Sequence, residues 1–128
     1  MSRKPALPKP TARELELLDT LWRLGSATAR EVHEARLEER SDITYANVLR
    51  LMQIMHGKGM LKRDEESRPH VYAPAHPQKS MRTGLLSDLI NKAFAGSAKD
   101  LVLAALSGHV SKAEKDEIRR FLKESRDE

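Results

Sequence analysis

The stretch ITYANVLRLMQIMHGKGMLKRDEESRPHVYAP, residues 43–74, decides the fold, because the spacing of its apolar residues changes part-way along it. In its first half, apolar residues recur at helical spacing: Val48, Leu51, Met52 and Met55. This spacing predicts a helix over residues 44–56, which a glycine-rich turn ends. Beyond it the period falls to two, which predicts strands at 60–63 and 70–74 around a charged turn at 64–69. The stretch is therefore expected to be a helix followed by a β-hairpin.

A first helix is predicted well before this stretch, directly after Thr11. Thr11 and Glu14 have the spacing of a capping box, in which the hydroxyl and the carboxylate satisfy free amides at a helix start. Apolar residues then form one wide face: Leu15, Leu17, Leu18, Leu21, Trp22 and Leu24. Gly25 is typical of the residue that ends a helix.

A second helix is predicted after Thr28, which has Glu31 three residues later as a second capping pair. Its inward face is expected to contain Val32, Ala35 and Leu37, and its solvated face Arg30, Glu34, Glu38 and Glu39. Three helices followed by a β-hairpin is the order of elements in a winged helix-turn-helix, whose hairpin is the wing.

The chain from residue 76 onward is expected to form three short helices. The run 95–97 breaks the first, residues 101–106 form a nearly all-apolar second, and Ser111 with Glu114 caps the third. These helices have more apolar surface than they can hide from water, which is typical of an interface. We expect a homodimer through Leu85, Leu86, Leu89, Ile90, Leu101, Leu103, Ile118, Phe121 and Leu122. The alternative is a tail that folds back on its own winged domain as a monomeric cap.

The predicted fold is thus mainly α with a small β-hairpin wing, a winged helix-turn-helix domain plus a helical dimerisation tail. Its parts are a flexible basic arm at 1–10, a winged helix DNA-binding domain at 11–75 and a helical dimerisation region at 76–128. The arm contains Arg3, Lys4 and Lys9 and three prolines. Such an arm can enter a DNA minor groove, although a disordered tail is the simpler interpretation.

Composition excludes several classes of protein. The chain has 128 residues, 23 Lys and Arg against 19 Asp and Glu, and a formal charge of +4, which permits a nucleic-acid partner. It has no cysteine, which excludes disulfides, thiol nucleophiles and thiolate metal sites. The start of the chain is expected to be neither a signal nor a transit peptide, and no stretch approaches the ~20 apolar residues of a membrane span. We expect a cytoplasmic protein without membrane insertion.

The predicted third helix is the candidate reading head for DNA. Its non-core residues near the start are Thr44, Tyr45, Ala46, Asn47 and Arg50. Side chains at this place reach base edges in the major groove, where Asn47 suits adenine and Arg50 suits guanine. An ordinary amphipathic helix has a similar polar face, and the hairpin that follows favours the reading head.

The predicted wing supplies Arg68 and His70 as contacts to the sugar-phosphate backbone. Lys62 and Arg63 lie in the same hairpin. The acidic residues of the turn would repel phosphate and are interpreted as a solvated turn: Asp64, Glu65 and Glu66.

Catalysis finds little support in the sequence. The histidines have no metal-ligand spacing: His33, His56, His70, His76 and His109. The sequence also lacks a nucleophile elbow and a glycine-rich phosphate loop. We expect no enzyme activity, no metal and no cofactor.

Five segments, in this order, resemble the penicillinase-repressor family of the BlaI/MecI/CopY type. They are TARELELLDTLW (11–22), AREV (29–32), ITYANVL (43–49), GKGML (57–61) and VYAP (71–74). In order, they are similar to the opening helix, the second helix, the recognition helix with its exit, and the end of the wing. The resemblance covers residues 11–74 closely and the tail more loosely.

The resemblance implies a bacterial repressor that binds a palindromic double-stranded DNA operator as a homodimer. In the family the repressor is often paired with a membrane-embedded sensor protease, and induction involves cleavage of the repressor in its tail. The family's cleavage site is a polar residue followed by an aromatic one, whereas the matching positions here are Ala104 and Ala105. Ile54 stands where many relatives have arginine, and the C-terminal cysteines that sense copper in CopY-type members are missing. The alternative function is a winged-helix protein-interaction module that does not bind DNA.

Overall fold

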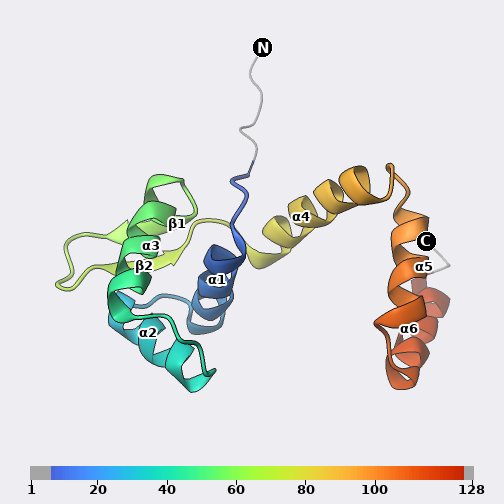
Figure 1. Cartoon of the computed structure of the whole chain (residues 1–128), viewed down its shortest axis with the longest axis horizontal. Coiled ribbons are helices and arrows are strands. Elements are labelled where there is room, and N and C mark those ends of the chain that lie inside the picture. The colour runs from blue at the N-terminus through green and yellow to red at the C-terminus, as the bar shows by residue number, and fades with distance from the viewer. Residues whose placement is uncertain (1–6, 126–128) are drawn as a thin grey trace, which may run out of the picture. The chain divides into compact units, whose positions relative to one another are not determined.

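The computed structural model describes residues 7–125 (Figure 1). Within them the elements are α1 (Ala12–Leu24), α2 (Ala29–Glu38), α3 (Tyr45–Gly57), β1 (Leu61–Asp64), β2 (Val71–Pro74), α4 (Gln78–Ala93), α5 (Ala98–Gly108) and α6 (Lys112–Ser125). This order confirms the predicted, mainly helical fold with a hairpin after the third helix. Of the predicted basic arm, Arg3 and Lys4 lie outside the described residues, and Lys9 is exposed.

The helix starts are where local hydrogen bonding predicts them. The amide of Glu14 donates to Thr11 Oγ1 at 3.2 Å, and the amide of Thr11 donates to Glu14 Oε1 at 2.8 Å. The same reciprocal pair forms between Thr28 and Glu31 at the start of α2. At the end of α1, Gly25 has a φ of +84°, a left-handed conformation that favours glycine.

The chain divides into two compact units, with the boundary after Leu85. The core of the first unit is built from α1, α2, α3 and the hairpin, and consists mainly of Leu17, Leu18, Leu21, Val32, Val48, Met52, Met55, Met60, Leu61 and Tyr72. Met81 of α4 also belongs to this core, and Trp22 Nε1 donates to the carbonyl of His76 at 3.0 Å. Residues just after 75 therefore pack with the first unit.

Two leucines expected on inward faces are exposed instead. Leu24 is 47% exposed and Leu37 is 51% exposed. Each lies in the last turn of its helix, beyond the last core residue of that helix, which is Leu21 in α1 and Val32 in α2. The apolar face of each helix is therefore buried only where another helix or strand packs against it, although the apolar spacing continues to the end of the helix.

The wing contains a contact that periodicity did not predict. The strands β1 and β2 are antiparallel, with Arg63 opposite Tyr72. Ala27, in the link between α1 and α2, exchanges two backbone hydrogen bonds with Tyr72, of 2.9 and 2.8 Å. The hairpin is thus tied to the start of α2.

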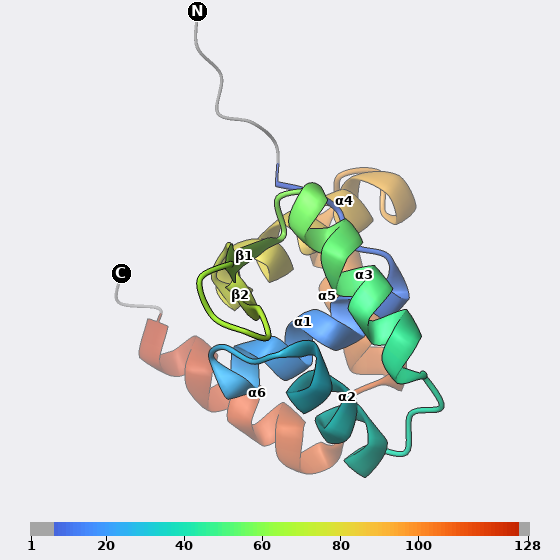
Figure 2. The same cartoon turned by 90° about the vertical axis from the view of Figure 1, so that its left-hand side faces the viewer.

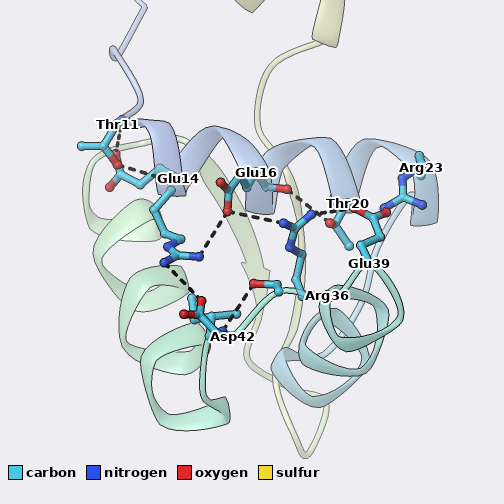
Figure 3. Close-up of polar contacts among 11 residues, drawn as sticks. Thr11, Glu14, Glu16, Thr20, Arg23, Arg36, Glu39 and Asp42 are labelled. Carbon is cyan, nitrogen blue, oxygen red and sulfur yellow. Dashed lines mark hydrogen bonds and ion pairs between the residues drawn. The ribbon is translucent and has the colours of Figure 1, made fainter.

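A charged network joins α1 to α2 (Figure 3). The Arg36 side chain is 12% exposed, and its Nη2 lies 3.4 Å from Glu16 Oε2 while its Nη1 lies 2.8 Å from Glu39 Oε2. Arg23 pairs with the same Glu39. Glu39, which was expected to be merely solvated, therefore helps to hold α2 against α1, and α2 in turn packs against α3 (Figure 2).

In the second unit the break between α4 and α5 lies where it was predicted, with positive φ at Ala95 and Gly96. The helix that follows begins earlier than the expected residue 101. Ser97, interpreted from the sequence as part of the break, is the N-cap of α5, and its Oγ accepts the Asp100 amide at 3.1 Å. A capping hydroxyl thus adds a turn to the apolar helix. Ala104 and Ala105 lie inside α5.

Candidate nucleic-acid interface

The start of α3 combines a buried stripe with an exposed polar face. Val48, Met52 and Met55 are buried in the core. The exposed residues at the start of the helix are Thr44, Tyr45, Ala46, Asn47 and Arg50. The five candidate reading residues therefore share one accessible end of one helix.

Thr44 has a local role in this arrangement. It is the N-cap of α3, and its Oγ1 accepts the backbone amide of Asn47 at 3.2 Å. This bond uses the hydroxyl to start the helix and to fix the backbone at Asn47. The Asn47 side chain stays exposed.

Tyr45 is held by two residues of α2. The guanidinium carbon of Arg30 lies 5.1 Å from the centroid of the Tyr45 ring, within the range of a cation–π interaction. The His33 ring meets the same ring at 6.0 Å between centroids and 67° between planes, an edge-to-face contact. Tyr45 is 37% exposed, so the two contacts orient a side chain that still reaches solvent.

Sequence reasoning assigned Arg30 only to the solvated face of α2 and gave His33 no role at this site. The cluster forms because α2 and α3 pack side by side (Figure 2). Arg30 and Tyr45 are fifteen positions apart, so neither the helical period nor a capping signal relates them. No signal in a single sequence would have found this pair.

A groove of about 570 Å³ adjoins the cluster. Thr28, Ala29 and Arg30 line it at the start of α2, and Tyr45, Leu49 and Gln53 line it on α3. The wing contributes the rest: Pro69, His70 and Tyr72. The groove brings His70 close to the residues at the start of α3, although it is far from them in the sequence.

In the wing, Arg68 and His70 contact each other. Arg68 Nη1 lies 2.7 Å from His70 Nε2 and also donates to the carbonyl of Glu65 at 3.2 Å. Arg68 is exposed and His70 is half-buried.

The acidic turn of the wing does more than contact solvent. Asp64 accepts from the Glu66 amide and the Ser67 hydroxyl, both at 3.0 Å, and these hydrogen bonds lower the pKa of Asp64. Glu65 pairs with Arg63, which also lowers the Glu65 pKa. The carboxylates of the turn therefore form hydrogen bonds and an ion pair within the wing itself. Arg63 is paired with Glu65, whereas Arg68 is exposed and contacts no carboxylate in the described hydrogen bonds.

The second unit exposes much apolar surface. None of its described residues is buried in a single chain. Among the candidate dimerisation residues Leu86, Leu89, Phe121 and Leu122 are exposed, while Leu85, which belongs to the first unit, Ile90, Leu101 and Ile118 are half-buried. Val102 and Leu103 of α5 are also exposed.

Comparison with known proteins identifies the family. The family model described as penicillinase repressor matches residues 10–124. The chain belongs to the penicillinase repressor family. It is also similar to the protein named transcriptional regulator BlaI in two strains of Mycobacterium tuberculosis, CDC 1551 / Oshkosh and ATCC 25618 / H37Rv. Each match is 32% identical over 112 residues, which cover 87% of this chain and 80% of the relative.

Membership of the penicillinase repressor family makes this chain a transcriptional regulator of the BlaI type with a winged-helix fold, and such regulators are not enzymes. The family model spans both units, so the tail is part of the resemblance as well as the winged domain. No helix among residues 7–125 combines the length and the apolar character that crossing a membrane requires.

Proposed function

We propose that this penicillinase repressor family member is a DNA-binding repressor that binds a palindromic operator as a homodimer in the bacterial cytoplasm. The observation that carries the proposal is the exposed start of α3, where Asn47 and Arg50 are accessible on a helix whose other face is buried. Amide and guanidinium groups at this place of a helix-turn-helix match the donor and acceptor pattern of base edges.

Each candidate residue has a defined role in this proposal. Asn47 and Arg50 read base edges, and Tyr45 and Ala46 supply apolar contact to the major groove of the DNA. Thr44 caps the helix and lies against a phosphate, while Arg68 and His70 contact the backbone from the wing. In this division, α3 carries the sequence preference and the wing adds affinity for any sequence.

The proposed homodimer rests on the surface of the second unit. α5 and α6 contain no buried residue among those described, and Phe121 and Leu122 are 66% and 59% exposed. Each Leu or Ile that becomes buried contributes about 1.5–3 kcal/mol, which favours pairing of two such surfaces. A two-fold pair would also present two reading heads to half-sites about 34 Å apart.

An electrophoretic shift tests the proposal. Duplex DNA from upstream of the protein's own gene is compared with a random duplex of equal length at moderate salt. We expect the upstream DNA to be retained at a concentration at which the random duplex is free. Retention of neither duplex would instead favour the protein-interaction module, and equal retention of both would overturn the preference for an operator.

A further inference from the structure

The groove between α2, α3 and the wing carries a further inference, which rests on the proposed DNA binding. Its lining combines apolar surface from the half-buried Leu49 with the cation of Arg30, and none of the described residues that line it is Asp or Glu. Two other hollows of the first unit do contain carboxylates, at Asp42 in one and at Glu16, Asp19 and Glu39 in the other. A further hollow of this unit, beside Trp22 and His76, is lined by no Asp, Glu, Lys or Arg among residues 7–125. In the part of the chain that the structure describes, only the groove among these four hollows combines an arginine and apolar surface without a carboxylate, which suits a ligand that has both negative charge and apolar parts.

Arg30 differs from the neighbouring arginines in what holds it. Arg36 lies between two carboxylates, which neutralise its charge. Arg30 stacks on the Tyr45 ring at 5.1 Å, and an aromatic ring orients a guanidinium without neutralising it. Because Arg30 is exposed, its N–H donors remain accessible beside the groove.

We propose that the groove seats one strand of the DNA backbone, with Arg30 donating to a phosphate and Leu49 lying under deoxyribose. Tyr45 brings the groove to the start of α3, whereas Asn47 and Arg50 line the hollow that contains Asp42. A strand in the groove would therefore lie on the Tyr45 side of α3 and flank the base pairs that α3 reads. In this arrangement Tyr45 is a positioning residue for Arg30, because its ring restricts the guanidinium before DNA arrives.

Fluorescence anisotropy with labelled upstream and random duplexes, each titrated over a series of salt concentrations, tests the proposal. We expect Arg30→Gln to weaken binding to both duplexes by the same factor, roughly tenfold, since it removes one charged hydrogen bond. It should also reduce the slope of log K against log salt by about one. Arg30→Lys should restore the slope, because it keeps the charge.

The matched control is Arg23→Gln, which removes an exposed arginine of the same unit that pairs with Glu39 and lies outside the groove. It should leave both the affinity and the slope as in the wild type. Thermal melting by circular dichroism confirms that each variant is folded.

A double-mutant cycle tests the part of Tyr45. If the ring positions Arg30, Tyr45→Leu should weaken binding to the random duplex more in the wild-type background than in Arg30→Gln. Equal fold-losses in the two backgrounds would overturn the positioning role.

The outcomes separate this inference from the proposed function. If the wild type prefers the upstream duplex and Arg30→Gln binds both duplexes with unchanged affinity, only the groove assignment is overturned. A change of sequence preference in Arg30→Gln would also overturn the groove assignment alone. If the wild type binds both duplexes equally and Arg30→Gln lowers the affinity for both, only the operator-specific repressor is overturned. A wild type that binds neither duplex would overturn both.

Discussion

Lys58 Nζ lies 2.9 Å from Glu14 Oε2, and this ion pair joins the end of α3 to the first turn of α1. The Glu14 residue is only 1% exposed. Burial raises the pKa of Glu14, but the hydrogen bond from the Thr11 amide and the pair with Lys58 outweigh it and hold the pKa below its ordinary value of 4.5. One buried carboxylate thus fixes both the start of α1 and the far end of the proposed reading helix.

Glu14→Gln should lower the free energy of unfolding by about 2 kcal/mol. The substitution keeps the size of the side chain but removes the charge that Thr11 and Lys58 share. Urea unfolding followed by Trp22 fluorescence at one fixed protein concentration measures the difference. Glu38→Gln, which removes an exposed carboxylate of α2, is the control and should change stability by less than about 0.5 kcal/mol. Equal effects of the two changes would contradict the buried pair.

The stabilising effect of Glu14 should depend on pH. Because its pKa is lower in the folded state, its contribution is complete above the ordinary value of 4.5 and is lost as the pH falls through the lower, folded value. The gap in stability between the wild type and Glu14→Gln should therefore be largest near neutral pH and should close below pH 4.5. Unfolding curves at a series of acidic pH values measure it, and a gap that widens on acidification would show the opposite sign of shift.

Arg50→Ala and Arg68→Ala should affect DNA binding in different ways. Arg50→Ala removes a base contact in the proposed reading head, so it should relax the preference at one position in each half-site and cost about 1–3 kcal/mol per lost bidentate contact. Arg68→Ala should weaken all sequences about equally and flatten the salt dependence. Binding to a set of operators with single base changes distinguishes these effects, and a new sequence preference in Arg68→Ala would refute this division of roles.

Leu89→Glu should give a folded monomer with sharply weakened operator binding. Leu89 is 49% exposed in the single chain, so a carboxylate there is tolerated by the monomer but costly in an apolar interface. Sedimentation at tens of micromolar, together with a thermal melt, measures the association state and the folding of wild type and variant. Ser87→Glu places the same charge at an exposed polar position of α4 as a control. A monomeric wild type in this range would refute the homodimer and support the tail as a cap.

The sequence by itself determined where the hairpin lies and where the helices begin and end, apart from the start of α5, which is at Ala98 and not at residue 101. The capping pairs at Thr11, Thr28 and Ser111 join residues three apart, so nearest neighbours decide them. The change of period after α3 is likewise local, because strand and helix differ in which neighbours share a face. The order of these elements was enough to indicate the fold, and the resemblance carried by the same segments indicated the family.

Tertiary structure alone decided which residues of a helical face are buried and which polar groups meet. Leu24 and Leu37 continue apolar faces yet are exposed, while Met81 lies in the core of the first unit. The stacking of Arg30 on Tyr45 depends on how two helices pack. Packing is a relation between distant positions in the chain, and the spacing of residues along one element does not contain it.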